Sequence, residues 1–175
     1  ICNAVRFECP SLMGCLIYNP KTIGKEMKKQ QICILGSTGS IGTQALDVIR
    51  QHSDRYEVYC LTANNSVEKL AQQAREFKPA AVVIANEAHH DALQQRLNDL
   101  PEIKVYAGKE ALEQIVSASP IDMVLAAMVG FSGLVPTINA IKAHKKICLA
   151  NKETLVVAGE LICNLAKENH VPILP

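Results

Sequence analysis

Short apolar runs alternate with amphipathic stretches from Gln31 to the end of the 175-residue chain. The first run, residues 32–35, is apolar and β-branched, which is typical of a strand buried on both faces. The stretch that follows carries apolar side chains at helical spacing up to Gln51, which predicts an amphipathic helix. The alternation then repeats. It predicts further strands at residues 58–62, 81–85, 103–106, 123–127, 147–150 and 171–174, and further helices at residues 67–77, 87–97, 109–116, 134–143 and 154–168.

Strands that alternate with helices predict βαβ units, and therefore an α/β fold with a parallel sheet. Because such crossovers are right-handed, we expect a Rossmann-like sheet that is doubly wound, with helices on both faces. Ligands of such sheets bind at the carboxyl ends of the strands. The chain stops at Pro175, directly after the last predicted strand, and we therefore expect that it is truncated.

Residues 1–27 follow neither periodicity. Their longest apolar stretch is too short for a secretory signal, and they are poorer in Arg and Ser than a transit peptide. We therefore expect an unstructured or adventitious leader produced by an over-extended reading frame. The alternative is the remnant of a plastid-type transit peptide.

Composition and charge exclude several classes of function. Eighteen Lys and Arg residues against 17 Asp and Glu give a net charge of +1, which provides no basic surface for nucleic acid. No apolar stretch approaches the roughly 18 residues that span a bilayer, so we expect no membrane partner. The seven cysteines include no C-x-x-C pair, and the acidic and histidine residues show no ligand spacing, so no metal site is indicated. Cys33, Cys60 and Cys148 lie in predicted strands as buried free thiols, which indicates a reducing compartment.

A glycine-rich turn joins the first predicted strand to the first predicted helix. Its sequence from Gly36 to Gly42 has the spacing G-x-x-G-x-x-G. Glycines allow a tight turn and a close approach of the backbone to a pyrophosphate, and the amides of Thr38, Ser40 and Ile41 would face that anion. The turn therefore predicts a dinucleotide site. The alternative is that its glycines only make a sharp turn.

The residues after the second predicted strand bear on the choice between NAD and NADP. A carboxylate at this place binds the ribose 2′-hydroxyl of NAD and repels the 2′-phosphate of NADP. The chain has Asn64, Asn65 and Ser66 here, and the absence of a carboxylate favours NADP. No Arg or Lys occupies these positions either, and the nearest basic residue is Lys69, one helical turn later.

A second polar cluster, Asn151, Lys152 and Glu153, follows the sixth predicted strand. Lys152 could hold an anionic substrate or a carbonyl oxygen, and Glu153 could orient a nicotinamide or a hydroxyl. The alternative is a plain helix start, with Asn151 as N-cap and Glu153 stabilised by the helix dipole. The pattern alone leaves both interpretations open.

These segments resemble one enzyme family. Residues 34–42 together with 46–50, and residues 149–155, resemble the N-terminal part of 1-deoxy-D-xylulose 5-phosphate reductoisomerase. The resemblance covers residues 28–175 and implies an enzyme of the non-mevalonate isoprenoid pathway. Members rearrange 1-deoxy-D-xylulose 5-phosphate and reduce the product with NADPH to 2-C-methyl-D-erythritol 4-phosphate, assisted by Mg²⁺ or Mn²⁺.

The resemblance also implies roles for individual residues. The NADPH-binding positions that it implies are Thr38, Gly39, Ser40, Ile41, Asn64, Asn65, Ser66, Asn151 and Glu153. The first four would hold the pyrophosphate, the next three would face the adenosine ribose phosphate, and the last two would contact NADPH near the nicotinamide. Lys152 would bind the sugar phosphate through a charge-assisted hydrogen bond.

The family's acidic metal-binding motif would follow Pro175. We therefore expect residues 28–175 to form an NADPH-binding Rossmann-like domain, truncated before the catalytic domain and inactive alone. The full-length protein is expected to be a homodimer in a bacterial cytoplasm, with a plastid-type organelle as the alternative. Two other functions remain open: another Rossmann oxidoreductase, and a non-catalytic NADP(H)-binding module.

Overall fold

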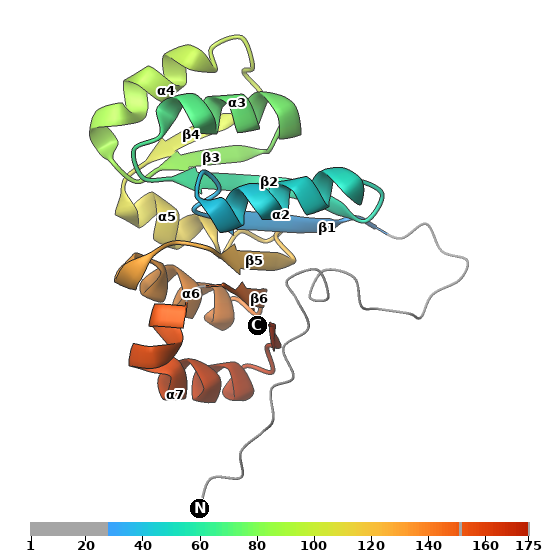
Figure 1. Cartoon of the computed structure of the whole chain (residues 1–175), viewed down its shortest axis with the longest axis vertical. Helices are drawn as coiled ribbons and strands as arrows, with labels where there is room; N and C mark the ends of the chain where they lie inside the picture. Colours follow the sequence, from blue (N-terminus) through green and yellow to red (C-terminus); the bar gives the residue numbers. More distant parts are fainter. Residues whose placement is uncertain (1–27, 151, 175) are drawn as a thin grey trace, which may run out of the picture.

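A seven-stranded sheet forms the centre of the protein (Figure 1). The computed structural model describes residues 28–150 and 152–174, so the predicted leader at residues 1–27 lies outside the described residues. The strand order is β4-β3-β2-β1-β5-β6-β7, and every neighbouring pair is parallel. The strands are β1 (Gln30–Leu35), β2 (Tyr56–Ala63), β3 (Ala81–Ile84), β4 (Lys104–Ala107), β5 (Met123–Ala126), β6 (Lys146–Leu149) and β7 (Ile173–Leu174).

Helices cover both faces of the sheet, which confirms the predicted doubly wound α/β fold (Figure 1). The helices on one face are α2 (Ser40–Gln51), α3 (Val67–Phe77) and α4 (His90–Arg96). Those on the other face are α5 (Lys109–Ile115), α6 (Leu134–Lys142) and α7 (Lys152–Glu168).

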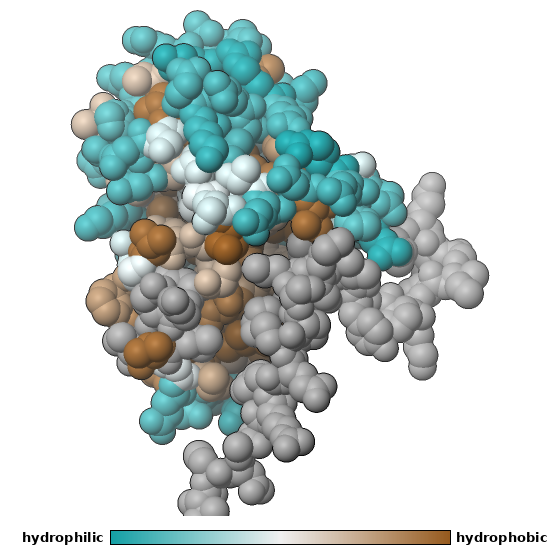
Figure 2. Space-filling view, viewed as in Figure 1, coloured by the Kyte–Doolittle hydropathy of each residue, from teal (hydrophilic) through white to brown (hydrophobic). Residues whose placement is uncertain are grey.

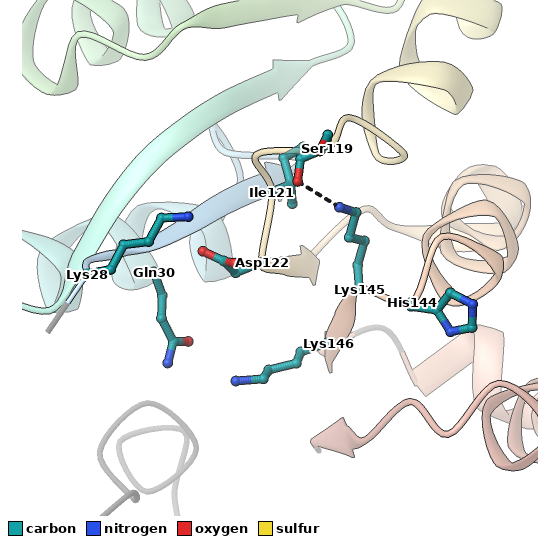
Figure 3. A pocket seen from close by; sticks show the side chains of 8 residues that line it. All are labelled: Lys28, Gln30, Ser119, Ile121, Asp122, His144, Lys145 and Lys146. Atoms are coloured by element: carbon teal, nitrogen blue, oxygen red, sulfur yellow. Dashed lines mark hydrogen bonds between the residues drawn. The ribbon is translucent and has the colours of Figure 1, made fainter. Parts of the chain in front are cut away.

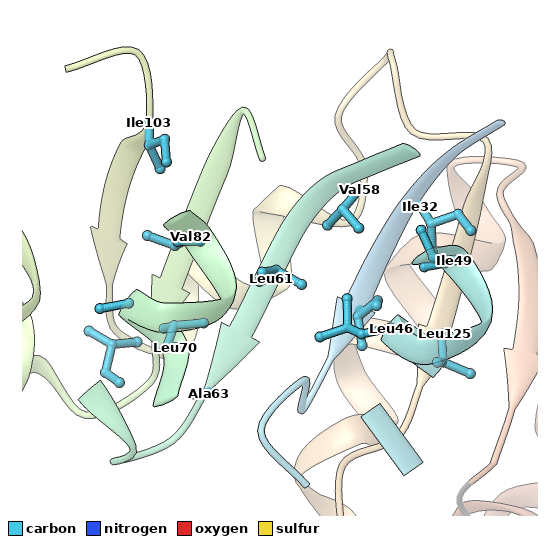
Figure 4. Close-up of a cluster of buried hydrophobic side chains, with 14 of the residues drawn as sticks. Ile32, Leu46, Ile49, Val58, Leu61, Ala63, Leu70, Val82, Ile103 and Leu125 are labelled. Carbon is cyan, nitrogen blue, oxygen red and sulfur yellow. The ribbon is translucent and has the colours of Figure 1, made fainter. Parts of the chain in front are cut away.

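The two faces have separate hydrophobic cores because side chains alternate along each strand. In β1, Ile32 and Ile34 belong to the core under α2 and α3, and Cys33 and Leu35 belong to the core under α5 to α7. Figure 4 shows the first core, where Leu46 and Ile49 of α2 lie over Ile32. Each fully buried Leu or Ile contributes about 1.5–3 kcal/mol, so these stripes fix the helices on the sheet.

Three elements differ from their predicted form. The segment predicted as one helix at 87–97 begins as a 3-10 turn, η1 (Glu87–His89), before α4 starts. The side chain of Asn86 accepts a hydrogen bond from the Ala88 amide at 3.1 Å, which stabilises that turn. Helix α7 is interrupted at Ala158 (φ −131°, ψ 20°), and the last strand shortens to the two residues of β7.

Cys33 and Cys60 are register partners on β1 and β2, and both are completely buried. The pKa of the Cys60 thiol is raised well above its ordinary value by its hydrogen bond to Cys33 and by burial. Cys148 is buried as well, as the strand pattern predicted, whereas Cys163 on α7 is exposed. Within the described ranges, no helix combines the length and apolarity that crossing a bilayer requires.

The thiols should therefore differ sharply in reactivity. We expect a thiol-specific reagent to label Cys163 in the folded protein and to leave Cys33, Cys60 and Cys148 unlabelled until denaturant is added, because the thiolate is the reactive form. Peptide mapping by mass spectrometry measures the labelling, with Cys163→Ser as the control. Labelling of Cys60 at the rate of Cys163 would contradict the buried arrangement.

Candidate functional site

The order in which strands are added to the sheet reverses at β1. The chain proceeds outward from β1 through β2, β3 and β4, and then returns to place β5 on the other side of β1. In open α/β sheets this reversal opens a crevice at the carboxyl ends of the two central strands. The loops after β1 and β5 meet closely there, since a Cβ atom on Gly36 would lie 3.0 Å from the carbonyl oxygen of Ala127.

The turn from Gly36 to Gly42 lies at that reversal and depends on its glycines. Gly36 has φ +82°, a backbone conformation that favours glycine. A Cβ atom on Gly42 would lie 2.4 Å from the Gly36 carbonyl oxygen and 2.6 Å from the Ser37 Cα, so no side chain fits there. The first turn of α2 is thereby packed directly onto the loop that precedes it.

Ser37 fixes this turn from its buried side. It is completely buried, its amide donates to the Thr62 carbonyl oxygen at 2.8 Å, and its hydroxyl donates to Gln73 Oε1 at 2.7 Å. Gln73 Nε2 returns a hydrogen bond to the Ser37 carbonyl oxygen at 2.9 Å. The turn is therefore joined to β2 and to α3 by buried polar contacts. The sequence analysis missed both Ser37 and Gln73, and the one available signal was a polar residue on the buried side of the helical pattern.

On its exposed side, the turn has backbone amides that make no hydrogen bond within the described residues. Gly39 is the N-cap of α2 and contributes no side-chain cap, and the first turn of α2 holds no acidic residue. Among the described residues, no hydrogen bond uses the amides of Ser40, Ile41 or Gly42. Free amides at the N-terminus of a helix fit a pyrophosphate, because the helix dipole adds positive potential at the same place. The residues present therefore fit the phosphates of a dinucleotide.

The loop after β2 lies beside this turn. Asn64, Asn65 and Ser66 are exposed, and Ser66 is the N-cap of α3 without a side-chain cap hydrogen bond. Asn65 Oδ1 accepts from Asn86 Nδ2 at 2.8 Å, and the Asn86 amide donates to the Asn64 carbonyl oxygen at 3.1 Å. Asn86, two residues after the end of β3, thus supports the loop after β2, and the sequence analysis did not identify it.

The segment after β6 is only partly described. Asn151 lies outside the described residues, and so do the side chains of Lys152 and Glu153, although both residues belong to the first turn of α7. Because β6 is the parallel neighbour of β5, α7 starts at the same edge of the sheet as the glycine turn. The roles of these three residues stay predictions.

The loop after β5 contributes apolar surface near this edge. Val129 is 86% exposed and Phe131 is 62% exposed, and Gly130 between them has φ +66°. Figure 2 shows the wider contrast: hydrophilic residues cover the half that carries α3 and α4, and apolar residues gather over β5, α6 and α7.

A hollow of about 400 Å³ lies at the opposite edge of the sheet, where β1 and β6 begin (Figure 3). Lys28, Lys145 and Lys146 line it together with Asp122, and Lys145 Nζ donates to the Ser119 carbonyl oxygen at 3.2 Å. None of the predicted site residues lines this hollow, so it is separate from the candidate site.

Comparison with known proteins identifies the family. The family model described as 1-deoxy-D-xylulose 5-phosphate reductoisomerase matches residues 32–159. The chain belongs to this family. The reductoisomerase of Bacteroides thetaiotaomicron is 67% identical over 151 residues, which cover 86% of this chain and 38% of that protein. The reductoisomerase of Phocaeicola vulgatus is 67% identical over 147 residues, 84% of this chain and 38% of that protein. The chain thus spans 38% of the length of these relatives.

Solved structures of reductoisomerases have the same fold. The reductoisomerase from Zymomonas mobilis in complex with NADPH aligns with a TM-score of 0.80 at 36% identity, covering 85% of this chain and 38% of that one. A reductoisomerase in complex with NADPH, fosmidomycin and magnesium aligns with a TM-score of 0.79 at 41% identity, covering 83% of this chain and 36% of that one. A homoserine dehydrogenase from S. aureus, at 20% identity and a TM-score of 0.52, shares the fold alone.

Gly42→Ala tests whether the reductoisomerase turn needs its close packing. The added Cβ would force the loop to shift, so we expect a loss of about 1–3 kcal/mol in the free energy of unfolding and weaker NADPH binding. Urea denaturation and a fluorescence titration measure the two effects. The control is Gly159→Ala on α7, where a Cβ would meet no atom within 4 Å. Equal results for the two variants would refute the packing argument.

Gln73→Leu tests the buried support of the turn. The substitution leaves the Ser37 carbonyl without its partner and leaves the Ser37 hydroxyl only the Thr62 carbonyl oxygen at 3.2 Å as an acceptor. We therefore expect it to lower the free energy of unfolding by about 1–3 kcal/mol. The neighbouring Gln72 is exposed on the same helix, so Gln72→Leu should change stability by less than about 0.5 kcal/mol. Urea denaturation of both variants measures the two changes in the free energy of unfolding. A smaller effect at Gln73 than at Gln72 would contradict the network.

Proposed function

We propose that this chain is the NADPH-binding part of an enzyme that converts 1-deoxy-D-xylulose 5-phosphate to 2-C-methyl-D-erythritol 4-phosphate. One observation carries the proposal: the free amides of α2 lie at the reversal of strand order in a chain of the reductoisomerase family. Residues 28–175 are proposed to form the NADPH-binding domain. The remainder of the enzyme corresponds to the part of the relatives that this chain does not span.

The chain's own residues would bind and orient the reactants. The amides of Ser40 and Ile41 would hold the pyrophosphate, and the loop after β2 would hold the adenosine ribose. Glu153 would orient the nicotinamide, and Lys152 would hold the sugar phosphate by its charge. NADPH, when bound, supplies the hydride for the reduction.

The described residues fit NADPH but not a divalent cation. Solved relatives hold magnesium, and we propose the same requirement for the full-length enzyme. Among the side chains that the structure describes, no group of three His, Cys, Asp or Glu residues could hold a metal ion. The described residues therefore do not fit a metal site, and its ligands are assigned to the remainder of the enzyme.

Cellular location and assembly follow from the same proposal. Buried thiols side by side on β1 and β2 suit a reducing compartment, and the curated relatives named above are bacterial. We therefore infer a cytoplasmic bacterial enzyme. The full-length protein is proposed to act as a homodimer.

The test uses the full-length protein that contains this chain. It should oxidise NADPH only when 1-deoxy-D-xylulose 5-phosphate and Mg²⁺ are present. Lys152→Ala should lower kcat/KM for the sugar phosphate by about 10- to 100-fold, the value of one charged hydrogen bond, while the Kd for NADPH stays within about twofold. Lys167→Ala, at the exposed far end of α7, is the control. Oxidation of NADPH that does not depend on the sugar phosphate would refute the proposed reaction.

A further inference from the structure

The ammonium group of Lys69 occupies a defined place between two loops of the candidate site. Its Nζ atom donates to the Thr38 carbonyl oxygen at 2.7 Å, across 31 residues of sequence. Thr38 belongs to the glycine turn, and Lys69 lies in the first turn of α3, directly after the loop that follows β2. This contact holds a cation where the adenosine ribose of a dinucleotide meets the end of the second strand. An ammonium has three donors, and the Thr38 carbonyl uses one of them.

The charge of Lys69 is not neutralised by its neighbours. The adjacent carboxylate, Glu68, pairs instead with Arg96 Nη1 of α4 at 2.6 Å. Among the described residues, Lys69 takes part in no ion pair. Its two remaining donors are therefore available to an anionic ligand.

The surroundings favour an anion at this place. The Ser66 hydroxyl is exposed and does not cap α3, and no hydrogen bond within the described parts of the chain uses the amides of Glu68 or Lys69. The dipole of α3 adds positive potential. Asn64, Asn65 and Ser66 are uncharged, so they can donate hydrogen bonds to a phosphate but cannot supply its counter-charge.

We propose that Lys69 determines the selection of NADPH over NADH by binding the 2′-phosphate, while it remains bonded to the Thr38 carbonyl. The inference rests on the proposed function and adds the residue that discriminates between the two cofactors. Asn64, Asn65 and Ser66 carry no positive charge, and Lys69, one helical turn later, supplies it.

The experiment compares two adenosine ligands that differ by the 2′-phosphate alone, adenosine 2′,5′-bisphosphate (2′,5′-ADP) and 5′-AMP, by calorimetry on this chain. Lys69→Gln should raise the Kd for 2′,5′-ADP by about tenfold or more, the value of a charge-assisted hydrogen bond, and leave the Kd for 5′-AMP within about twofold. Lys69→Arg should retain most of the preference. Lys78→Gln is the matched control, because Lys78 is exposed and lies at the other end of the same helix.

The outcomes separate the two levels of the proposal. If Lys69→Gln weakens both ligands equally, the residue acts only by supporting the glycine turn, and the inference is wrong. If neither ligand weakens while the wild-type chain binds NADPH, the inference fails and the proposed function stands. If the wild-type chain binds neither 2′,5′-ADP nor NADPH, the proposed function fails, and the inference fails with it. Melting temperatures of all variants within about 2 °C of wild type would exclude unfolding as the cause.

Discussion

The structure depends on satisfying the polar groups of Ser37 where they are completely buried, at the turn from β1 into α2. A buried donor or acceptor without a partner costs about 1–3 kcal/mol, and Ser37 presents an amide, a carbonyl and a hydroxyl. Thr62 and Gln73 satisfy all three. Thr62 also accepts a hydrogen bond from the Gly36 amide at 3.0 Å. The turn is therefore fixed from its buried side, so that its exposed side can leave helix amides unpaired.

Close backbone packing at two glycines also fixes the turn. Gly42 brings α2 against the Gly36 carbonyl oxygen, and Gly36 brings β1 against the loop after β5. Both contacts lie at the reversal of strand order. The phosphate site that we propose thus uses backbone amides alone, and the surrounding side chains would select between related ligands. Lys69 is the charged side chain to which we assign that selection, because its ammonium is already bonded to the turn.

Much of this could be predicted from the sequence, and the reasons are local. The alternation of β-branched runs with helical stripes predicts each strand and helix, because strand and helix periodicities are properties of short segments. The glycine spacing predicts the turn for the same reason. The break at Glu87–His89 was missed because it depends on one side-chain hydrogen bond from Asn86. The contacts of Ser37 with Gln73 and of Lys69 with Thr38 join residues 36 and 31 positions apart. No local pattern encodes them, since they exist only once β1, β2 and α3 are packed together.

The central position of β1 also constrains the order in which the protein can assemble during its synthesis. The pairs from β1 to β4 form between segments that follow one another, whereas β1 meets β5 across 91 residues, as in the hydrogen bond from the Gln31 amide to Asp122 at 2.9 Å. One edge of β1 therefore stays unpaired on the ribosome until β5 has emerged. An unpaired apolar strand edge is a template for association with other chains. The reversal of strand order at β1 thus has two consequences. It creates the crevice where we propose that the dinucleotide binds, and it leaves an edge of β1 open to aggregation until β5 has been synthesised.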